Sequence, residues 1–216
     1  MPGEAPPDQA QDGTSAEQGG KDAAGESDPT VQSGERPGGE AEGNMEDPEM
    51  ARAMQAYEAL GDAPPKVDMS KNDAAYTDAH TLERHGPDIP LERNSAPVGD
   101  RTVEGRIYGD PPWGKPANYS YKWKDVSTMN RTVNDYLQNN WEQVRSDLAL
   151  EGRHEATFNT GNAVGEGYYN SGQYGAGPRQ AVYGQTSMAT ITINTVPGNP
   201  SAINIVRAYP NGSGSQ

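Results

Sequence analysis

The sequence predicts an α+β domain in which N-terminal helices are followed by an antiparallel sheet, with a disordered acidic tail in front. Apolar residues recur at helical spacing up to about residue 152, and strand-type alternation dominates after it. With 26 Gly, 18 Pro and 32% hydrophobic residues, the 216-residue chain is too polar to pack one core along its whole length. We therefore expect one ordinary domain and an additional segment.

The distribution of charge identifies that segment. Residues 1–75 contain 17 Asp and Glu against 5 Lys and Arg, a net charge of −12, whereas residues 76–216 contain 14 acidic and 12 basic residues, a net charge of −2. In residues 1–44, Val31 is the only large aliphatic side chain after Met1, so burial cannot offset the entropy of ordering, and we expect a disordered tail. The nearly neutral second part permits a nucleic-acid ligand but contains no basic stripe.

Several classes of protein are excluded or disfavoured. The chain has no cysteine, so disulfides and thiolate metal sites are impossible. No apolar run approaches the roughly 18 residues of a membrane span. The start, MPGEAPPDQAQDG, lacks the basic and apolar regions of a conventional signal peptide, so export is expected to use another route or a larger parent chain.

Residues 45–75 are predicted to form a short helix and a linker. Asp47 is a suitable cap and Pro48 suits the first helical position. An apolar series then follows at helical spacing: Met50, Met54, Tyr57 and Leu60. Gly61 and the Pro64-Pro65 pair end it. This series could dock a partner, but a surface helix beside the domain is the reading we favour.

A second helix is predicted from Tyr76 to His85. Gly86-Pro87 would end it, with Gly86 in the left-handed conformation that glycine adopts without strain. A Pro-rich stretch over 87–97 and an aromatic, loop-rich segment follow, up to Asp125.

The strongest local pattern predicts a third helix, capped by Ser127 and ended by Gly152. One face of it carries the apolar residues Val133, Tyr136, Leu137, Trp141, Val144 and Leu148. This amphipathic helix should pack on a sheet or on another helix.

The last part of the chain is predicted to form strands. Residues 186–196 and 202–209 alternate and are rich in β-branched residues, and Pro197–Ser201 between them predicts a hairpin with a five-residue loop. Residues 155–158 and 180–183 are weaker strand candidates. We expect the domain to span residues 76–210, with residues 211–216 as a flexible tail.

The chain contains three histidines: His80, His85 and His154. On one helix, residues 80 and 85 would point about 140° apart, so they do not form a natural zinc pair, and no carboxylate completes a ligand set. From the residues alone, each of these two histidines is more simply read as a structural or surface residue.

Four strings in order, AHTLERHGPD, GRIYGDPPWGKP, TMNRTVNDYLQNNW and IVRAYP, resemble the RNase A-like toxin domain found at the C-terminus of contact-dependent growth inhibition proteins and other polymorphic bacterial toxins. The similarity covers residues 76–210. It implies an RNase A-like fold without disulfides and cleavage of RNA without a metal or cofactor. It also implies delivery from the cell surface or by secretion, action in the cytoplasm of the target cell, and a dedicated immunity protein as partner.

The resemblance also implies site residues. Transesterification of RNA needs a base for the 2′-hydroxyl, an acid for the leaving 5′-oxygen and donors for the phosphorane charge. His85 matches the family histidine before the glycine and is the expected acid–base group, with His80 as its neighbour. Arg93 is the nearest match to the family arginine, although that arginine lies further along the chain in the family. Arg84 and Arg101 are the next candidates.

On the last strand, Tyr209 matches the family tyrosine, but Arg207 stands at the family threonine position. Because residues 207 and 209 point to the same side of a strand, both could face the cleft. Arg207 would then bind phosphate, or its presence would mark altered or lost activity. Each of these residues could instead have a structural role. His85 could bind carbonyls at the end of its helix, Arg93 could be a solvated surface residue, and Tyr209 could be an edge residue packed on the sheet.

Three functions remain open from the sequence. The first is a toxin ribonuclease acting on RNA, with tRNA among the candidate substrates. The second is a non-catalytic or decayed module that binds an immunity-type protein, and the third is another toxin chemistry directed at NAD. His154 is a further acid–base candidate if it lies near the cleft.

Overall fold

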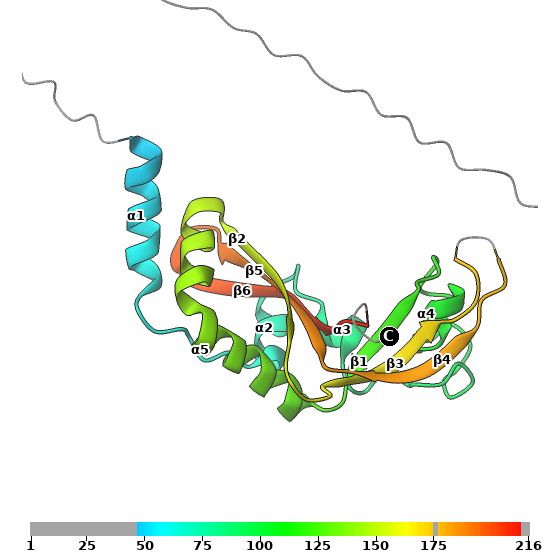
Figure 1. The fold of residues 1–216 in the computed structure, drawn as a ribbon. Helices are drawn as coiled ribbons and strands as arrows, with labels where there is room; N and C mark the ends of the chain where they lie inside the picture. The colour runs from blue at the N-terminus through cyan, green and yellow to red at the C-terminus, as the bar shows by residue number, and fades with distance from the viewer. Residues whose placement is uncertain (1–46, 175–176, 213–216) are drawn as a thin grey trace, which may run out of the picture. The chain divides into compact units, whose positions relative to one another are not determined.

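The computed structural model describes residues 47–174 and 177–212, and the predicted tail of residues 1–44 lies outside them (Figure 1). The helices are α1 (Pro48–Leu60), α2 (Met69–Ala75), α3 (Thr81–His85), α4 (Gly105–Tyr108) and α5 (Val126–Glu151). The strands are β1 (Tyr119–Trp123), β2 (Arg153–Asn159), β3 (Gly165–Asn170), β4 (Ala181–Thr186), β5 (Met188–Val196) and β6 (Asn199–Pro210). The α+β class is confirmed.

The strands form two three-stranded antiparallel sheets, in the orders β1-β3-β4 and β2-β5-β6. The strand candidates at 155–158 and 180–183 are confirmed as β2 and β4. The hairpin of β5 and β6 is also confirmed, but its loop is shorter than predicted. Val196 pairs with Asn199, so Pro197 and Gly198 alone make the turn, with Gly198 at φ 76°.

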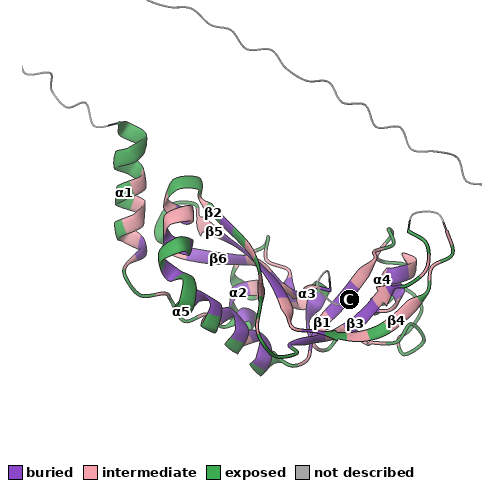
Figure 2. Cartoon of the chain, in the orientation of Figure 1, coloured by how far each residue is buried: buried purple, intermediate pink, exposed green. Residues whose placement is uncertain are grey.

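Helix α5 carries the main core on one face (Figure 2). All six residues of the predicted apolar series are buried there, and they pack with β5 and β6 residues such as Ile191, Ile193 and Ile205. The helix begins two residues earlier than predicted. Asp125, not Ser127, caps it by accepting from the Thr128 N–H at 2.7 Å, and Gly152 ends it at φ 71° as expected.

The predicted helix from Tyr76 to His85 is wrong in its first half. Tyr76 is extended (φ −123°, ψ 122°) and ends α2, and α3 starts only at Thr81. The Asp73 carboxylate supplies the reason, because it accepts from the Leu82 N–H at 2.7 Å and so starts a separate helix. Gly86 is not left-handed (φ −63°); a Cβ at this position would collide with the Leu82 carbonyl oxygen.

Strand β6 is an edge of its sheet, and the segment from α2 to α3 covers that edge. The buried Asn72 side chain forms two hydrogen bonds with the Ile205 backbone, donating to its oxygen at 2.8 Å and accepting from its N–H at 2.9 Å. The His80 N–H donates to the Val206 oxygen at 3.2 Å, and Thr81 Oγ1 accepts from the Ala208 N–H at 2.8 Å. These bonds take the place of a fourth strand.

The domain continues slightly beyond residue 210. The Asn211 N–H donates to the Met188 oxygen at 2.8 Å, and Gly212 is buried. The flexible tail expected from residue 211 therefore does not include these two residues, and residues 213–216 lie outside the described part of the chain.

Replacing Asn72 with alanine should destabilise the domain by about 3 kcal/mol, because a buried N–H and a buried C=O of Ile205 both lose their partner. Urea unfolding of the variant measures the loss. Lys71→Ala is the matched control on the exposed side of α2 and should change stability by less than about 0.5 kcal/mol. Equal stabilities of the two variants would contradict the role of Asn72.

Candidate active site

A small pocket of about 150 Å³ lies where α3, α4, β1 and β6 meet. Two histidines and three arginines line it: His80, His85, Arg84, Arg106 and Arg207. The remaining lining residues are Tyr119, Tyr121, Tyr209, Pro210, Asn211 and Gly212. None of these residues carries a carboxylate, so the pocket is suited to an anion.

His85 is the last residue of α3 and is only 8% exposed. Its ring stacks on Tyr209, with centroids 4.8 Å apart and planes 22° apart. Since a carbonyl oxygen only accepts, Nδ1 carries a proton and donates to the Tyr121 oxygen at 3.1 Å. Nε2 has no protein partner among residues 47–174 and 177–212, so its lone pair is available to a ligand.

Burial lowers the pKa of His85 from its ordinary 6.5 to about 3. The bond to Tyr121 acts in the opposite direction, and the positive charges of Arg106, His80 and Arg84 add to the lowering. The ring is therefore neutral at physiological pH and can accept a proton but has none to give from Nε2.

His80 and His85 line the same pocket, which one continuous helix would not allow. His80 precedes α3 and is not helical (φ −150°, ψ 28°), so the predicted separation of about 140° does not apply. Its Nδ1 donates to the Asp78 oxygen at 2.9 Å, and its side chain lines the same pocket as His85. The two histidines therefore belong to one site.

Arg207 and Tyr209 both line the pocket, as the alternation of a strand requires. Arg207 Nε donates to Thr192 Oγ1 at 3.1 Å, and Nη2 contacts Glu155 Oε1 at 3.2 Å. The guanidinium is thus held in place on the sheet and partly neutralised by Glu155.

Arg106, on α4, is the residue that sequence reasoning missed. Its guanidinium carbon lies 4.9 Å from the centre of the Trp113 ring. Burial, together with the nearby charge of Arg84, lowers the pKa of Arg106 from its ordinary value. Neither Arg84 nor Arg106 forms an ion pair with a carboxylate in the part of the chain that the structure describes, so an anion would relieve their repulsion. Arg106 stands inside the string GRIYGDPPWGKP, but nothing in its spacing distinguishes it from other arginines.

The structure places Arg93 outside this pocket. Its Nε lies 2.5 Å from Asp110 Oδ2, and its guanidinium carbon lies 4.5 Å from the centre of the Tyr108 ring. Arg101 is also outside and pairs with Glu83 at 2.7 Å. Of the candidates Arg84, Arg93 and Arg101, only Arg84 lines the pocket.

His154 also lies outside the pocket and is buried under α5. Its Nδ1 donates to Asp147 at 2.7 Å, and its Nε2 forms a hydrogen bond of 2.7 Å with the Tyr136 hydroxyl. With both nitrogens occupied, His154 ties β2 to α5 and is not an acid–base neighbour of His85.

The fold and this pocket define an α+β domain with a compact histidine–arginine site. Within the described residues, no group of three or more His, Asp or Glu could hold a metal ion. None of the helices described combines the length and apolar character that a membrane crossing requires.

No protein-family model and no curated protein matches this sequence. A solved structure, the CdiA-CT/CdiI complex from Y. kristensenii 33638, is similar to part of it, with a TM-score of 0.33 and 17% identity over 43% of this chain and 76% of that chain. A TM-score this low assigns neither a fold nor a function.

The buried His85 should make the domain sensitive to acid. Its folded pKa is about 3 against 6.5 unfolded, so only the unfolded state binds the proton between these values, and stability falls as pH falls through this window. Between pH 7.5 and pH 5 the loss from this residue should be about 2 kcal/mol, at about 1.4 kcal/mol per pH unit.

The measurement compares urea unfolding of the wild type and of His85→Gln at both pH values. Glutamine can still donate to the Tyr121 oxygen but does not titrate. Acid should therefore destabilise the wild type more than the variant. A parallel loss in both proteins would show that His85 does not titrate in this way.

Proposed function

We propose that this domain is a metal-independent ribonuclease of the bacterial toxin kind, with an RNase A-like arrangement of helices and sheets. One observation carries the proposal: a neutral, buried His85 shares a pocket with His80, three arginines and Tyr209, and no carboxylate lines that pocket. The resemblance of residues 76–210 to the RNase A-like toxin domain supports it independently.

In this proposal the scissile phosphate of RNA occupies the pocket. His85 Nε2 accepts the proton of the 2′-hydroxyl while O2′ forms a bond to phosphorus. The bond from phosphorus to O5′ then breaks, and His80 gives a proton to O5′. The products are a 2′,3′-cyclic phosphate and a free 5′-hydroxyl, and proton exchange with water restores both rings.

The arginines supply the electrostatic part of the mechanism. Arg84 and Arg106 bring positive charge without a carboxylate beside it, so they can stabilise the phosphorane as its charge grows. Tyr209 holds the His85 ring by stacking and lines the pocket, so its hydroxyl is proposed as a further donor to the phosphate. A dedicated immunity protein is proposed to cover this pocket until the toxin reaches the cytoplasm of a target cell.

A second candidate function rests on Arg207. Arg207 stands at the family threonine position and is bound to Thr192 and Glu155. Because Glu155 partly neutralises its charge, Arg207 would attract a phosphate less strongly than an unpaired arginine does. A decayed module that only binds an immunity-type protein would show this feature. Expression without a partner separates the two functions, since intact host RNA and normal growth indicate the binding module.

His85→Ala should lower the rate of RNA cleavage by about a hundredfold to ten-thousandfold, because the base is lost. Arg106→Ala should lower it by roughly a hundredfold, because charge stabilisation is lost. Arg93→Ala is the matched control and should retain the wild-type rate, since Arg93 pairs with Asp110 outside the pocket. The assay measures cleavage of total RNA in EDTA and identifies the cyclic phosphate.

Full activity of His85→Ala would refute the proposed base. If the rate of RNA cleavage fell strongly in Arg93→Ala and not in Arg106→Ala, Arg93 rather than Arg106 would be the residue that binds the phosphate.

A further inference from the structure

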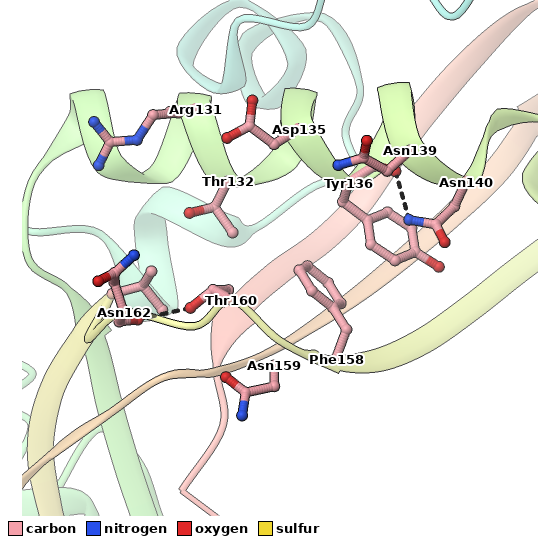
Figure 3. Close-up of a pocket in the computed structure, with 11 residues that line it drawn as sticks. Arg131, Thr132, Asp135, Tyr136, Asn139, Asn140, Phe158, Asn159, Thr160 and Asn162 are labelled. Carbon is pink, nitrogen blue, oxygen red and sulfur yellow. Dashed lines mark hydrogen bonds between the residues drawn. The ribbon is translucent and has the colours of Figure 1, made fainter.

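A second pocket, of about 460 Å³, lies between α5 and the connection from β2 to β3. Figure 3 shows Thr132 and Tyr136 of α5 on one side, and Phe158 and Thr160 on the other. It shares no lining residue with the candidate active site. Nothing in the proposed reaction uses it.

The aromatic wall of this pocket is held rigidly. Phe158 is the only phenylalanine of the chain, and its ring stacks on Tyr136 with centroids 4.3 Å apart. The Tyr136 hydroxyl is fixed by His154, which Asp147 holds from the other side. The buried network thus orients a stacking surface before any ligand arrives.

The remaining wall presents polar groups without protein partners. The side chains of Asn139 and Asn162 form no hydrogen bond within the described residues, and Arg131 and Asp135 form no ion pair there. Asn140 interrupts the helix (φ −128°, ψ 16°) and donates its NH₂ to the Tyr136 oxygen at 2.8 Å, which leaves its side-chain oxygen available.

We infer that this pocket binds one unstacked base of the RNA substrate, an inference that rests on the proposed ribonuclease function. An aromatic face receives a base by stacking. Amide side chains offer a donor and an acceptor side by side, which is the pattern that reads the hydrogen-bonding edge of a base in single-stranded RNA. Arg131 at the rim can contact the adjoining phosphate.

The register of the sheet places this pocket near the same strand ends as the candidate active site. Phe158 pairs with Ala189, and Ala189 pairs with Pro210, which lines the candidate active site. With strands about 4.8 Å apart, the backbones of Phe158 and Pro210 are separated by roughly 10 Å. Phe158 faces α5, whereas Arg207 faces the opposite side of the same sheet, so an RNA that occupies both pockets passes round the edge strand β2. RNAs with an unpaired base a few nucleotides from the cut would then be preferred.

The test uses the full chain and a short, fluorescently labelled oligoribonucleotide whose 2′-O-methyl groups prevent cleavage. Asn139→Ala and Asn162→Ala should each raise the Kd measured by fluorescence anisotropy about fivefold, since each removes hydrogen bonds to the base. Gln138→Ala is the matched control, because Gln138 precedes Asn139 on α5, is also exposed and lies outside this pocket. It should bind as the wild type does.

A dinucleotide substrate separates this inference from the proposed function, since it is too short to reach both pockets. Asn139→Ala should cleave it at the wild-type rate. If the wild type cleaves RNA while both asparagine variants bind the oligoribonucleotide as tightly as the wild type, the base-binding pocket is refuted and the ribonuclease stands. If the wild type binds but cleaves neither substrate, the ribonuclease function fails. Absence of RNA binding by the wild type overturns the inference.

Discussion

The candidate site depends on how the outer edge of β6 is covered. Asn72 satisfies both backbone groups of Ile205, and the backbone of His80 and the hydroxyl of Thr81 bind the next part of the strand. Because these bonds are made to Ile205, Val206 and Ala208 in turn, they fix α3 in register with β6. His80 and His85 are thereby held beside Arg207 and Tyr209, although more than 120 residues separate the two pairs in sequence.

The two sheets meet at the same place. Trp123 of β1 donates to the Ala208 oxygen of β6 at 2.9 Å, and the neighbouring Tyr121 carbonyl binds His85. These contacts exclude water from the imidazole, which lowers the pKa of His85 and leaves it neutral among several arginines. A cluster of cationic side chains is costly to the fold, and Trp113 and Glu155 offset part of that cost by holding Arg106 and Arg207. An anion would offset the rest.

The sequence predicted the elements whose signals are local. The apolar series of α5 and the alternation of β5 and β6 depend only on neighbouring residues, and both are correct. Strand β3 was missed because its glycines weaken strand propensity. Gly167 is needed where a Cβ would collide with the Ser120 carbonyl oxygen across the sheet, a constraint that appears only after pairing. Arg106 was missed for the same reason, since only the fold brings α4 to β6.

The alternation of side chains in the β2-β5-β6 sheet explains why His80 and His85 line the candidate active site whereas His154 packs under α5. In β2 and β6, Glu155 and Arg207 share one face and form an ion pair there, whereas His154 and Phe158 point to the other face and pack under α5. A shift of one residue in β2 would exchange these sets and leave Arg207 without its carboxylate. The register that builds the cationic pocket on one face therefore also builds the polar pocket against α5. Since β2 and β6 run in the same direction, each pocket takes its strand residues from the C-terminal end of its strand, on opposite faces of one sheet.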